Sequence, residues 1–265
     1  MRNNMLRDFN KEKFDIFIQA GQSNSHGFGI GDVEEPYIPN DNVWYMIGQE
    51  EEFILLPASE TVLVNEVQSD YSLSFSRKYI EKGLLEEGRK ILILRTSVGS
   101  SGFANGNWGE NAPLFHRMLE MLSCAMSLNK ENRVKCLLWH QGESDAVDNV
   151  DFLTHKSNLT KLLQSVREAC SLPELPFIAG DFVQHWKNDN IEICQPIIDA
   201  IRAVCAEQKN AVFVETDGLK SNRQELGRKT QCGMEVIEDT IHFSRRSLYL
   251  LGERYFQAYT TICKR

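Results

Sequence analysis

Two groups of residues at opposite ends of this sequence have the types and spacing that acyl transfer requires. Ser23 lies in the tetrad GQSN at positions 21–24, directly after the apolar run 14–18, which predicts a buried β-strand. Asp239 and His242 stand three residues apart near the other end of the chain. A carboxylate at that spacing can reach one imidazole nitrogen and leave the other facing a serine hydroxyl. This combination predicts a nucleophile, a general base and the acid that orients the base.

A third group, the heptad WHQGESD at positions 139–145, also follows an apolar run directly. Its charged and amide side chains suit a polar cleft, and Gln141 can offer an amide N–H to a developing oxyanion. Glu143 is a rival or auxiliary acid for His242, ranked below Asp239 because Asp239 needs no tertiary contact to reach the imidazole. The glycine-containing turn at 98–102 is a weaker signal, since such a turn can direct backbone N–H groups at an anion.

Each group also has a purely structural interpretation. Ser23 could cap the helix that follows the first strand, and Ser144 or Asp145 could cap a helix after the third group. Asp239 and His242 could form a local surface pair. Taken together, however, the groups all fall at strand or helix ends, which favours a shared site.

The segments between these groups predict the elements that position them. Short apolar runs at 91–94, 134–139, 177–180 and 212–214 are bounded by breakers, as expected for central parallel strands covered on both faces. Helical spacing of apolar residues recurs at 71–79, 159–166, 194–204 and 248–259, and Pro113 is suited to open a further helix. Ser69 or Asp70, and Ser244, are candidate helix caps.

This alternation predicts an α/β fold, a three-layer α/β/α sandwich with a central, mostly parallel sheet. Ligands bind in such sheets at the carboxyl ends of the strands. Residues 27–42 and 97–111 lack a clear period and follow strands, so we expect both segments to wall the site. Nothing in the composition demands a second domain, and we expect a single domain over residues 1–265.

Composition and charge exclude several classes of function. With a formal net charge of −8 and no basic stripe, the chain would be repelled by nucleic acid and by anionic membranes. The N-terminus has no apolar signal region, and no run approaches the ~18 apolar residues of a membrane span. Seven cysteines without a CxxC pair argue against a disulfide framework. We therefore expect a cytoplasmic protein, and nothing indicates or excludes a homo-oligomer.

The sequence predicts neither a metal nor an organic cofactor. No phosphate-binding or dinucleotide-binding loop is present. Four histidines show no metal-ligand spacing: His26, His116, His155 and His185. Three cysteines lie in apolar periodic segments, where we expect small buried core residues: Cys136, Cys194 and Cys205.

The blocks taken together resemble one known superfamily. The chain is similar to the SGNH (GDSL-like) hydrolases, which have a flavodoxin-like fold, and within them to the branch of sialate O-acetylesterases and acetylxylan esterases. That branch carries a GQSN nucleophile block, a glycine-containing second block, a WHQGE(S/A)D third block and a DxxH last block. Here these are residues 21–24, Gly99, 139–145 and 239–242, so the resemblance spans nearly the whole chain. Val98-Gly99 stands where the branch usually has a paired glycine. Ser25-His26 stands where a small or apolar pair usually follows the GQSN tetrad.

The resemblance implies a role for each block residue. Ser23 is the nucleophile, His242 is the general base and then the general acid, and Asp239 orients and stabilises the imidazolium. The oxyanion hole is formed by the backbone N–H groups of Ser23 and Gly99 and by the amide of Gln141. The auxiliary residues are Gln22, Asn24 and Glu143.

These roles predict a carbohydrate O-acetylesterase that cleaves acetyl esters of sialic acid or xylo-oligosaccharides through an acetyl-enzyme, with a small acetylated carbohydrate as its partner. A short-chain lipase or thioesterase on the same scaffold is one alternative. A non-catalytic carbohydrate-binding protein is another, which the intact triad disfavours. Four aromatic residues in or near loops could stack on a sugar ring, although burial over the core is the simpler interpretation: Tyr37, Phe103, Trp108 and Trp186.

Overall fold

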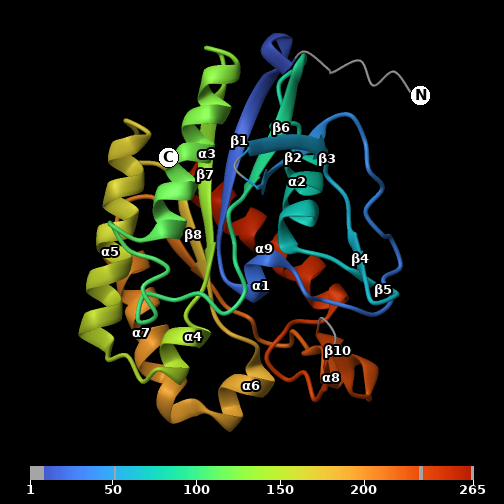
Figure 1. Ribbon diagram of the computed structural model, residues 1–265, viewed down its shortest axis with the longest axis vertical. Coiled ribbons are helices and arrows are strands. Elements are labelled where there is room, and N and C mark those ends of the chain that lie inside the picture. The colour runs from blue at the N-terminus through green and yellow to red at the C-terminus, as the bar shows by residue number, and fades with distance from the viewer. Residues whose placement is uncertain (1–8, 51, 233–234, 264–265) are drawn as a thin grey trace.

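The computed structural model describes residues 9–50, 52–232 and 235–263, and its central feature is one twisted sheet (Figure 1). In spatial order the seven described strands of this sheet are β3 (Glu52–Pro57), β2 (Val43–Gln49), β6 (Arg89–Arg95), β1 (Lys13–Gly21), β7 (Arg133–His140), β8 (Phe177–Gly180) and β9 (Ala211–Val214). All neighbouring strands run parallel except β2 and β3. The predicted mostly parallel sheet is confirmed.

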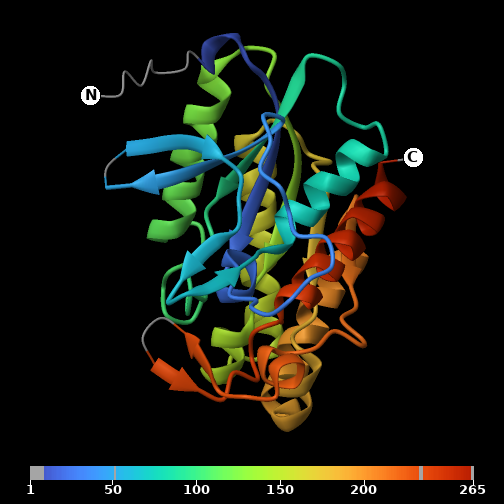
Figure 2. The ribbon, with the colours of Figure 1, turned by 90° about the vertical axis from the view of Figure 1, so that its right-hand side faces the viewer.

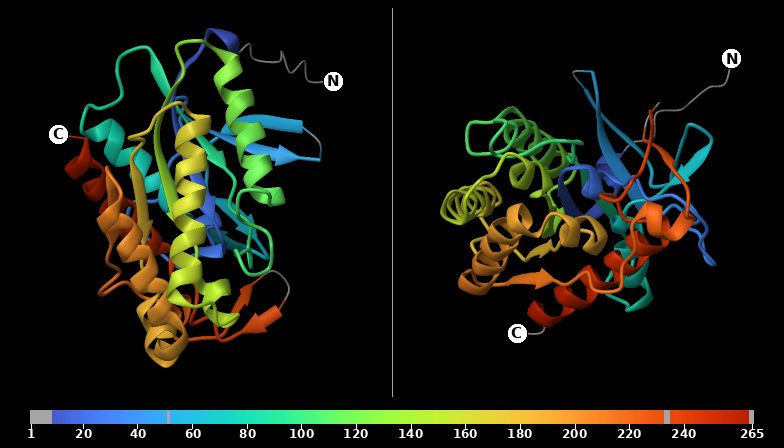
Figure 3. Two further views of the ribbon diagram at one scale, coloured as in Figure 1. Left: turned by 90° about the vertical axis from the view of Figure 1, so that its left-hand side faces the viewer. Right: turned by 90° about the horizontal axis from the view of Figure 1, so that it is seen from below.

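Long helices cover both faces of this sheet. One core cluster joins it to α3 (Pro113–Leu128), α5 (Phe152–Ala169) and α7 (Ile191–Glu207), and a second joins its other face to α2 (Tyr71–Glu81) and α9 (Arg245–Ile262). Seen from below, green α3 and red α9 lie on opposite sides of blue β1 (Figure 3). The predicted three-layer α/β/α arrangement is confirmed.

The central strand β1 shows why the predicted strands read as continuous apolar runs. Phe14, Ile16 and Ile18 face the cluster with α3, α5 and α7, whereas Phe17 faces the cluster with α2 and α9. All four side chains are fully buried. Because helices cover both faces, a parallel strand here has no solvent-facing side and needs no alternation of polar residues.

The predicted helix ends are also confirmed. The Asp70 side chain caps α2 by accepting from Ser72 N, and the Ser244 side chain caps α9 by accepting from Ser247 N. Pro113 is the first residue of α3, where its missing N–H costs no intrahelical bond. Cys136, Cys194 and Cys205 are buried, as expected.

Several short elements are not predicted from the sequence. They are the 3₁₀ turn Phe9–Lys11, α6 (Gln184–Asp189), α8 (Asn222–Leu226), β4 (Thr61–Leu63), β5 (Glu66–Gln68), β10 (Thr230–Cys232) and β11 (Glu235–Ile237). The short helices α1 (Ser23–His26) and α4 (Glu143–Val147) were expected only in the capping alternatives. The edge strand β3 and its neighbour β2 are also missed, although the apolar run 43–47 carries the same signal as the predicted strands. The hairpins β4–β5 and β10–β11 lie toward the end of the molecule where α1 follows β1 (Figure 2), and an Arg228–Glu66 ion pair of 2.7 Å links them.

The carboxyl ends of the parallel strands meet at one edge of the sheet, where segment 97–111 and the first part of segment 27–42 lie. The end of segment 27–42 lies at the amino ends of the strands instead, where Asp41 pairs with Lys90 at 2.7 Å and the carbonyl oxygen of Asn42 accepts from Ile91 N at 2.8 Å. The expectation that all of 27–42 walls the site is therefore wrong for that end. Residues 27–42 and 97–111 contain no helix and no named strand, as predicted, and they follow α1 and β6 respectively. Within the described residues no helix is both long and apolar enough to cross a membrane.

Gly21 allows the chain to turn sharply at the end of β1. Its φ is +134°, and a Cβ at this position would lie 2.1 Å from the carbonyl oxygen of His140. On either side, Gln22 N donates to His140 O at 3.0 Å and Val98 N donates to Gly21 O at 3.1 Å. The turn that carries Ser23 therefore fits tightly between the ends of β6 and β7.

We expect Gly21→Ala to destabilise the protein by roughly 2–5 kcal/mol, because backbone strain adds to the clash with His140. Gly83→Ala is the matched control, since Gly83 also has a positive φ, +68°, but open space around it. Urea unfolding of both variants measures the difference. Equal losses at the two positions would show that the close approach to His140 does not matter.

Candidate active site

Ser23 lies at the junction of β1 and α1, at the carboxyl edge of the sheet. It is the first residue of α1, and the N-cap position belongs to Gln22, which makes no side-chain capping bond. The alternative in which Ser23 caps the helix is therefore wrong. The residue is largely buried but retains 7% of its surface exposed.

Gly99, in the loop after β6, faces Ser23 across the strand ends. A methyl group at Gly99 would stand 4.0 Å from Ser23 Cβ and 3.9 Å from the Phe28 ring. No backbone hydrogen bond in the described residues uses the N–H of Ser23 or of Gly99. Both N–H groups are thus free to point at a ligand oxygen.

His242 and Asp239 form a close pair in the loop that precedes α9. His242 Nδ1 lies 2.9 Å from Asp239 Oδ1, at an angle short of ideal for a hydrogen bond. The backbone N–H of His242 donates to the same oxygen at 3.1 Å, and Asn222 Nδ2 donates to Oδ2 at 2.7 Å. Burial alone would raise the pKa of the Asp239 carboxyl, but His242 and these donors hold that pKa below its ordinary value.

Phe28 connects the histidine to the nucleophile loop. Its ring lies 5.3 Å from the His242 ring on one side and stacks at 5.5 Å on the His26 ring on the other. Because Phe28 also approaches Gly99, it brings residues from both irregular segments and from the loop before α9 to one place. The sequence does not single out Phe28, and its only signal is a position in a loop that was expected to wall the site.

Asn24 joins the three blocks of the site through one amide. Its Nδ2 donates to Glu143 Oε1 at 2.6 Å and to the carbonyl oxygen of Ile241 at 3.0 Å. Its Oδ1 accepts from the backbone N–H of Phe243 at 3.1 Å. Asn24 therefore holds the peptide groups on both sides of His242 next to the residue that follows Ser23.

Glu143 supports Asn24 and makes no ion pair with His242. It is 1% exposed, and its Oε2 has no hydrogen-bond partner among the described residues. Burial raises the pKa of this carboxyl, although the bond from Asn24 opposes the shift. The structure thus pairs His242 with Asp239 and places Glu143 behind Asn24.

The side chains of Gln22 and Gln141 are buried beneath the candidate site. Gln22 Oε1 accepts from the backbone N–H of Ser144 at 3.1 Å. Gln141 is fully buried, and its Nε2 donates to Asp145 Oδ2 at 2.9 Å, leaving a second N–H with only contacts of 3.4 and 3.5 Å. Gly142 is the N-cap of α4 without a side-chain bond, so capping by Ser144 or Asp145 is wrong.

Most of the aromatic residues that could stack on a sugar are core residues. Phe103 and Trp108 are 8% and 2% exposed and pack on Trp139 with ring centroids 5.9 and 5.1 Å away. Tyr37 is 7% exposed, and Trp186 is half-buried against Phe182. The simpler interpretation, burial over the core, is therefore confirmed for Phe103, Trp108 and Tyr37.

The remaining histidines do not assemble a metal centre. His155 is buried, with Nδ1 3.3 Å from Asp145 Oδ2, and His185 Nδ1 lies 3.0 Å from Ser221 Oγ. The described residues contain no group of three or more His, Cys, Asp or Glu side chains able to hold a metal ion.

This fold and this order of blocks resemble those of the SGNH (GDSL-like) hydrolases. A family model described as "Carbohydrate esterase, sialic acid-specific acetylesterase" matches residues 13–261. The chain therefore belongs to that family of carbohydrate esterases.

Solved structures agree on the fold. The chain is similar to NanS, with a TM-score of 0.80 and 17% identity over 96% of this chain and 98% of that one. It is similar to a protein from Arabidopsis thaliana, with a TM-score of 0.71 and 20% identity over 93% and 98% of the two chains. It is also similar to a carbohydrate acetylesterase from Xanthomonas citri, with a TM-score of 0.60 and 14% identity over 94% and 56%.

One curated relative also matches in sequence. A probable carbohydrate esterase from Arabidopsis thaliana is 24% identical over 184 residues, which is 67% of this chain. The match spans 59% of the length of that relative.

The raised pKa of Glu143 gives a pH-dependent prediction. Between about pH 4.5 and its raised folded pKa, folded Glu143 keeps a proton that the unfolded chain loses, so rising pH costs stability. Glu143→Gln keeps an oxygen for Asn24 and cannot ionise. We expect this variant to have the same free energy of unfolding as the wild type at pH 4. As pH rises it should become more stable than the wild type, by up to about 1.4 kcal/mol per pH unit.

Urea unfolding at pH 4 and pH 8 measures this gain. The exposed Glu87→Gln is the control and should show no such trend. A wild type that gains stability over Glu143→Gln as pH rises would contradict the assignment of a neutral, buried acid.

Proposed function

We propose that this protein hydrolyses acetyl esters on carbohydrates of the sialic acid type, with Ser23 as nucleophile. The observation that carries the proposal is the Asp239–His242 pair held next to the serine turn through Asn24. Membership in a family described as sialic acid-specific acetylesterases supports the substrate class. The Xanthomonas citri protein of the same fold is itself described as a carbohydrate acetylesterase, which points the same way.

In the first step the Ser23 hydroxyl oxygen attacks the acetyl carbonyl carbon. His242 Nε2 takes the hydroxyl proton, because Asp239 at Nδ1 keeps the ring in the tautomer with a bare Nε2. The tetrahedral intermediate collapses as the bond to the sugar oxygen breaks, and His242 returns the proton to that oxygen. The sugar alcohol leaves and Ser23 is acetylated.

In the second step water replaces the sugar. His242 takes a proton from the water as its oxygen attacks the acetyl carbon, and then returns a proton to Ser23 as acetate leaves. The backbone N–H groups of Ser23 and Gly99, with the second N–H of Gln141, would hold the negative oxygen in both steps. Losing one such donor costs roughly 10²–10³ in turnover.

Two alternatives remain within reach of a direct test. A short-chain lipase or thioesterase on this scaffold would prefer longer acyl groups, whereas an acetylesterase would prefer acetate. A non-catalytic sugar-binding protein would hydrolyse neither. An acetylesterase and a lipase or thioesterase would differ in how much room they leave for an acyl chain beside Ser23 and Gly99.

We expect turnover of p-nitrophenyl acetate to exceed that of the butyrate and octanoate esters. Ser23→Ala should lower kcat by roughly 10⁴-fold or more, and Asp239→Asn by roughly 10³–10⁴-fold through the wrong imidazole tautomer. Initial rates with each ester measure both effects.

The exposed neighbour Ser100→Ala is the control for loss of a serine hydroxyl near the site, and it should retain wild-type rates. Undiminished activity in Ser23→Ala would refute the nucleophile, and a preference for octanoate would move the assignment to a lipase.

A further inference from the structure

One pocket at the site edge of the sheet is lined by cationic side chains and by no carboxylate. It has a volume of about 290 Å³ and lies between the ends of β2 and β6 and the first half of α3. Arg95 and Arg117 reach it from β6 and α3, and His26 reaches it from α1. Because the chain carries a formal net charge of −8, this pocket is a local exception.

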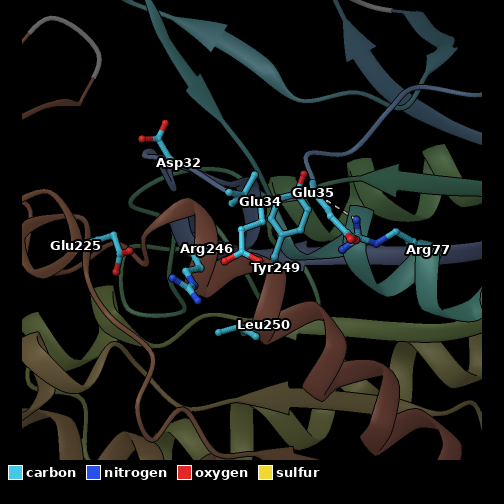
Figure 4. Close-up of a pocket in the computed structure, with 9 residues that line it drawn as sticks. Asp32, Glu34, Glu35, Arg77, Glu225, Arg246, Tyr249 and Leu250 are labelled. Atoms are coloured by element: carbon cyan, nitrogen blue, oxygen red, sulfur yellow. Dashed lines mark hydrogen bonds between the residues drawn. The ribbon is translucent and has the colours of Figure 1, made fainter.

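A larger pocket beside α9 has the opposite character. Its volume is about 450 Å³, and four carboxylates surround its two arginines, Arg77 and Arg246 (Figure 4). They belong to Asp32, Glu34, Glu35 and Glu225. Acidic groups in excess would repel an anion, so an anionic ligand would favour the smaller pocket.

Arg117 is held in place without a carboxylate partner. Its guanidinium lies 5.6 Å from the Phe53 ring centroid and donates to the carbonyl oxygen of Glu50 at 3.3 Å. Gly48 makes room for it, since a Cβ there would lie 2.1 Å from Arg117 Nη2. Among the described residues no acidic side chain forms an ion pair with Arg117, so its charge remains available to a ligand.

Arg95, the second arginine of the pocket, is fixed by contacts of its own. Its Nη2 donates to the carbonyl oxygen of His26 at 2.5 Å, and its guanidinium lies 4.7 Å from the Tyr45 ring centroid. Asp70 approaches Arg95 to 3.7 Å but does not line the pocket. Burial and the neighbouring Arg95 charge lower the pKa of His26, so at neutral pH the arginines supply the positive charge.

The pocket adjoins the nucleophile. Val98 lines it, and the next residue is Gly99, whose Cα is about 3.8 Å further along the chain. Gly99 faces Ser23, and the rings of His26, Phe28 and His242 form a row from the pocket to the base. A sugar that presents an ester to Ser23 can therefore place another substituent in this pocket.

We propose that the pocket binds a carboxylate on the sugar of the ester substrate, with Arg117 as the main contact and Arg95 as the second cation. The proposal rests on the proposed function, and it names the group that separates acidic sugars from neutral ones. A planar guanidinium matches a carboxylate with two parallel hydrogen bonds. The half-buried Ile47 and Leu114 on the wall of the pocket offer apolar surface to the carbon atoms that bear the acid.

The test compares an O-acetylated N-acetylneuraminic acid with its carboxylate methyl ester. The wild type should prefer the acid in kcat/KM. Arg117→Met should lower kcat/KM for the acid by roughly 10- to 100-fold, mainly through KM, so that the preference over the methyl ester collapses. Arg117→Lys keeps the positive charge but loses the planar guanidinium, so it should recover part of the preference for the acid over the methyl ester.

Arg246→Met, in the acid-lined pocket, is the matched control and should retain the wild-type preference. Equal wild-type kcat/KM for acid and methyl ester would overturn the proposal, and so would an Arg117→Met variant that loses both substrates alike. Thermal melts check that the variants are folded.

Failure of the esterase function itself would be recognised separately, as absence of wild-type turnover on p-nitrophenyl acetate and on both sugar esters. Calorimetric titration with free N-acetylneuraminic acid then tests the pocket alone. Binding that weakens in Arg117→Met and persists in Arg246→Met would support the carboxylate site, and no wild-type binding would overturn it.

Discussion

The candidate site depends on one buried amide, the side chain of Asn24. It follows the nucleophile in the chain and bonds to Glu143, to the carbonyl of Ile241 and to the N–H of Phe243. These partners are 119 to 219 residues away in sequence. Because a buried amide left without partners costs free energy, the three segments must approach together or not at all. The position of His242 relative to Ser23 follows from this constraint.

The sheet supplies the rest of the geometry. Strand β1 lies between β6 and β7, so Ser23, Gly99 and Gln141 follow three neighbouring strands and emerge at one edge. Gly21 lets the serine turn sit close to β7, and Asp239 stands beside His242 without help from the sheet. The same edge carries charge unevenly, with arginines beside the nucleophile loop and carboxylates around the pocket by α9. We infer that this division, and not the catalytic residues, selects among acetylated sugars.

Five of the seven described sheet strands and the long helices were predictable, because buried parallel strands appear as continuous apolar runs and helices as periodic ones. Ser23, Asp239 and His242 were predictable for a similar reason, since each has a local signal in a strand end or a three-residue spacing. The partners of Asn24, the burial of Phe103 and Trp108, and the approach of Arg117 to Gly48 have no such signal. They arise from contacts between distant segments. The run 43–47 carried a strand signal that could have been used.

The most direct test of the serine mechanism is to trap the acyl-enzyme. Wild-type protein mixed with p-nitrophenyl acetate is quenched in acid during the first turnover, digested, and analysed by mass spectrometry. We expect one acetyl group, on the peptide that contains Ser23 and on the serine itself. Acetylation of another residue, or ester hydrolysis with Ser23 unmodified throughout, would contradict the mechanism.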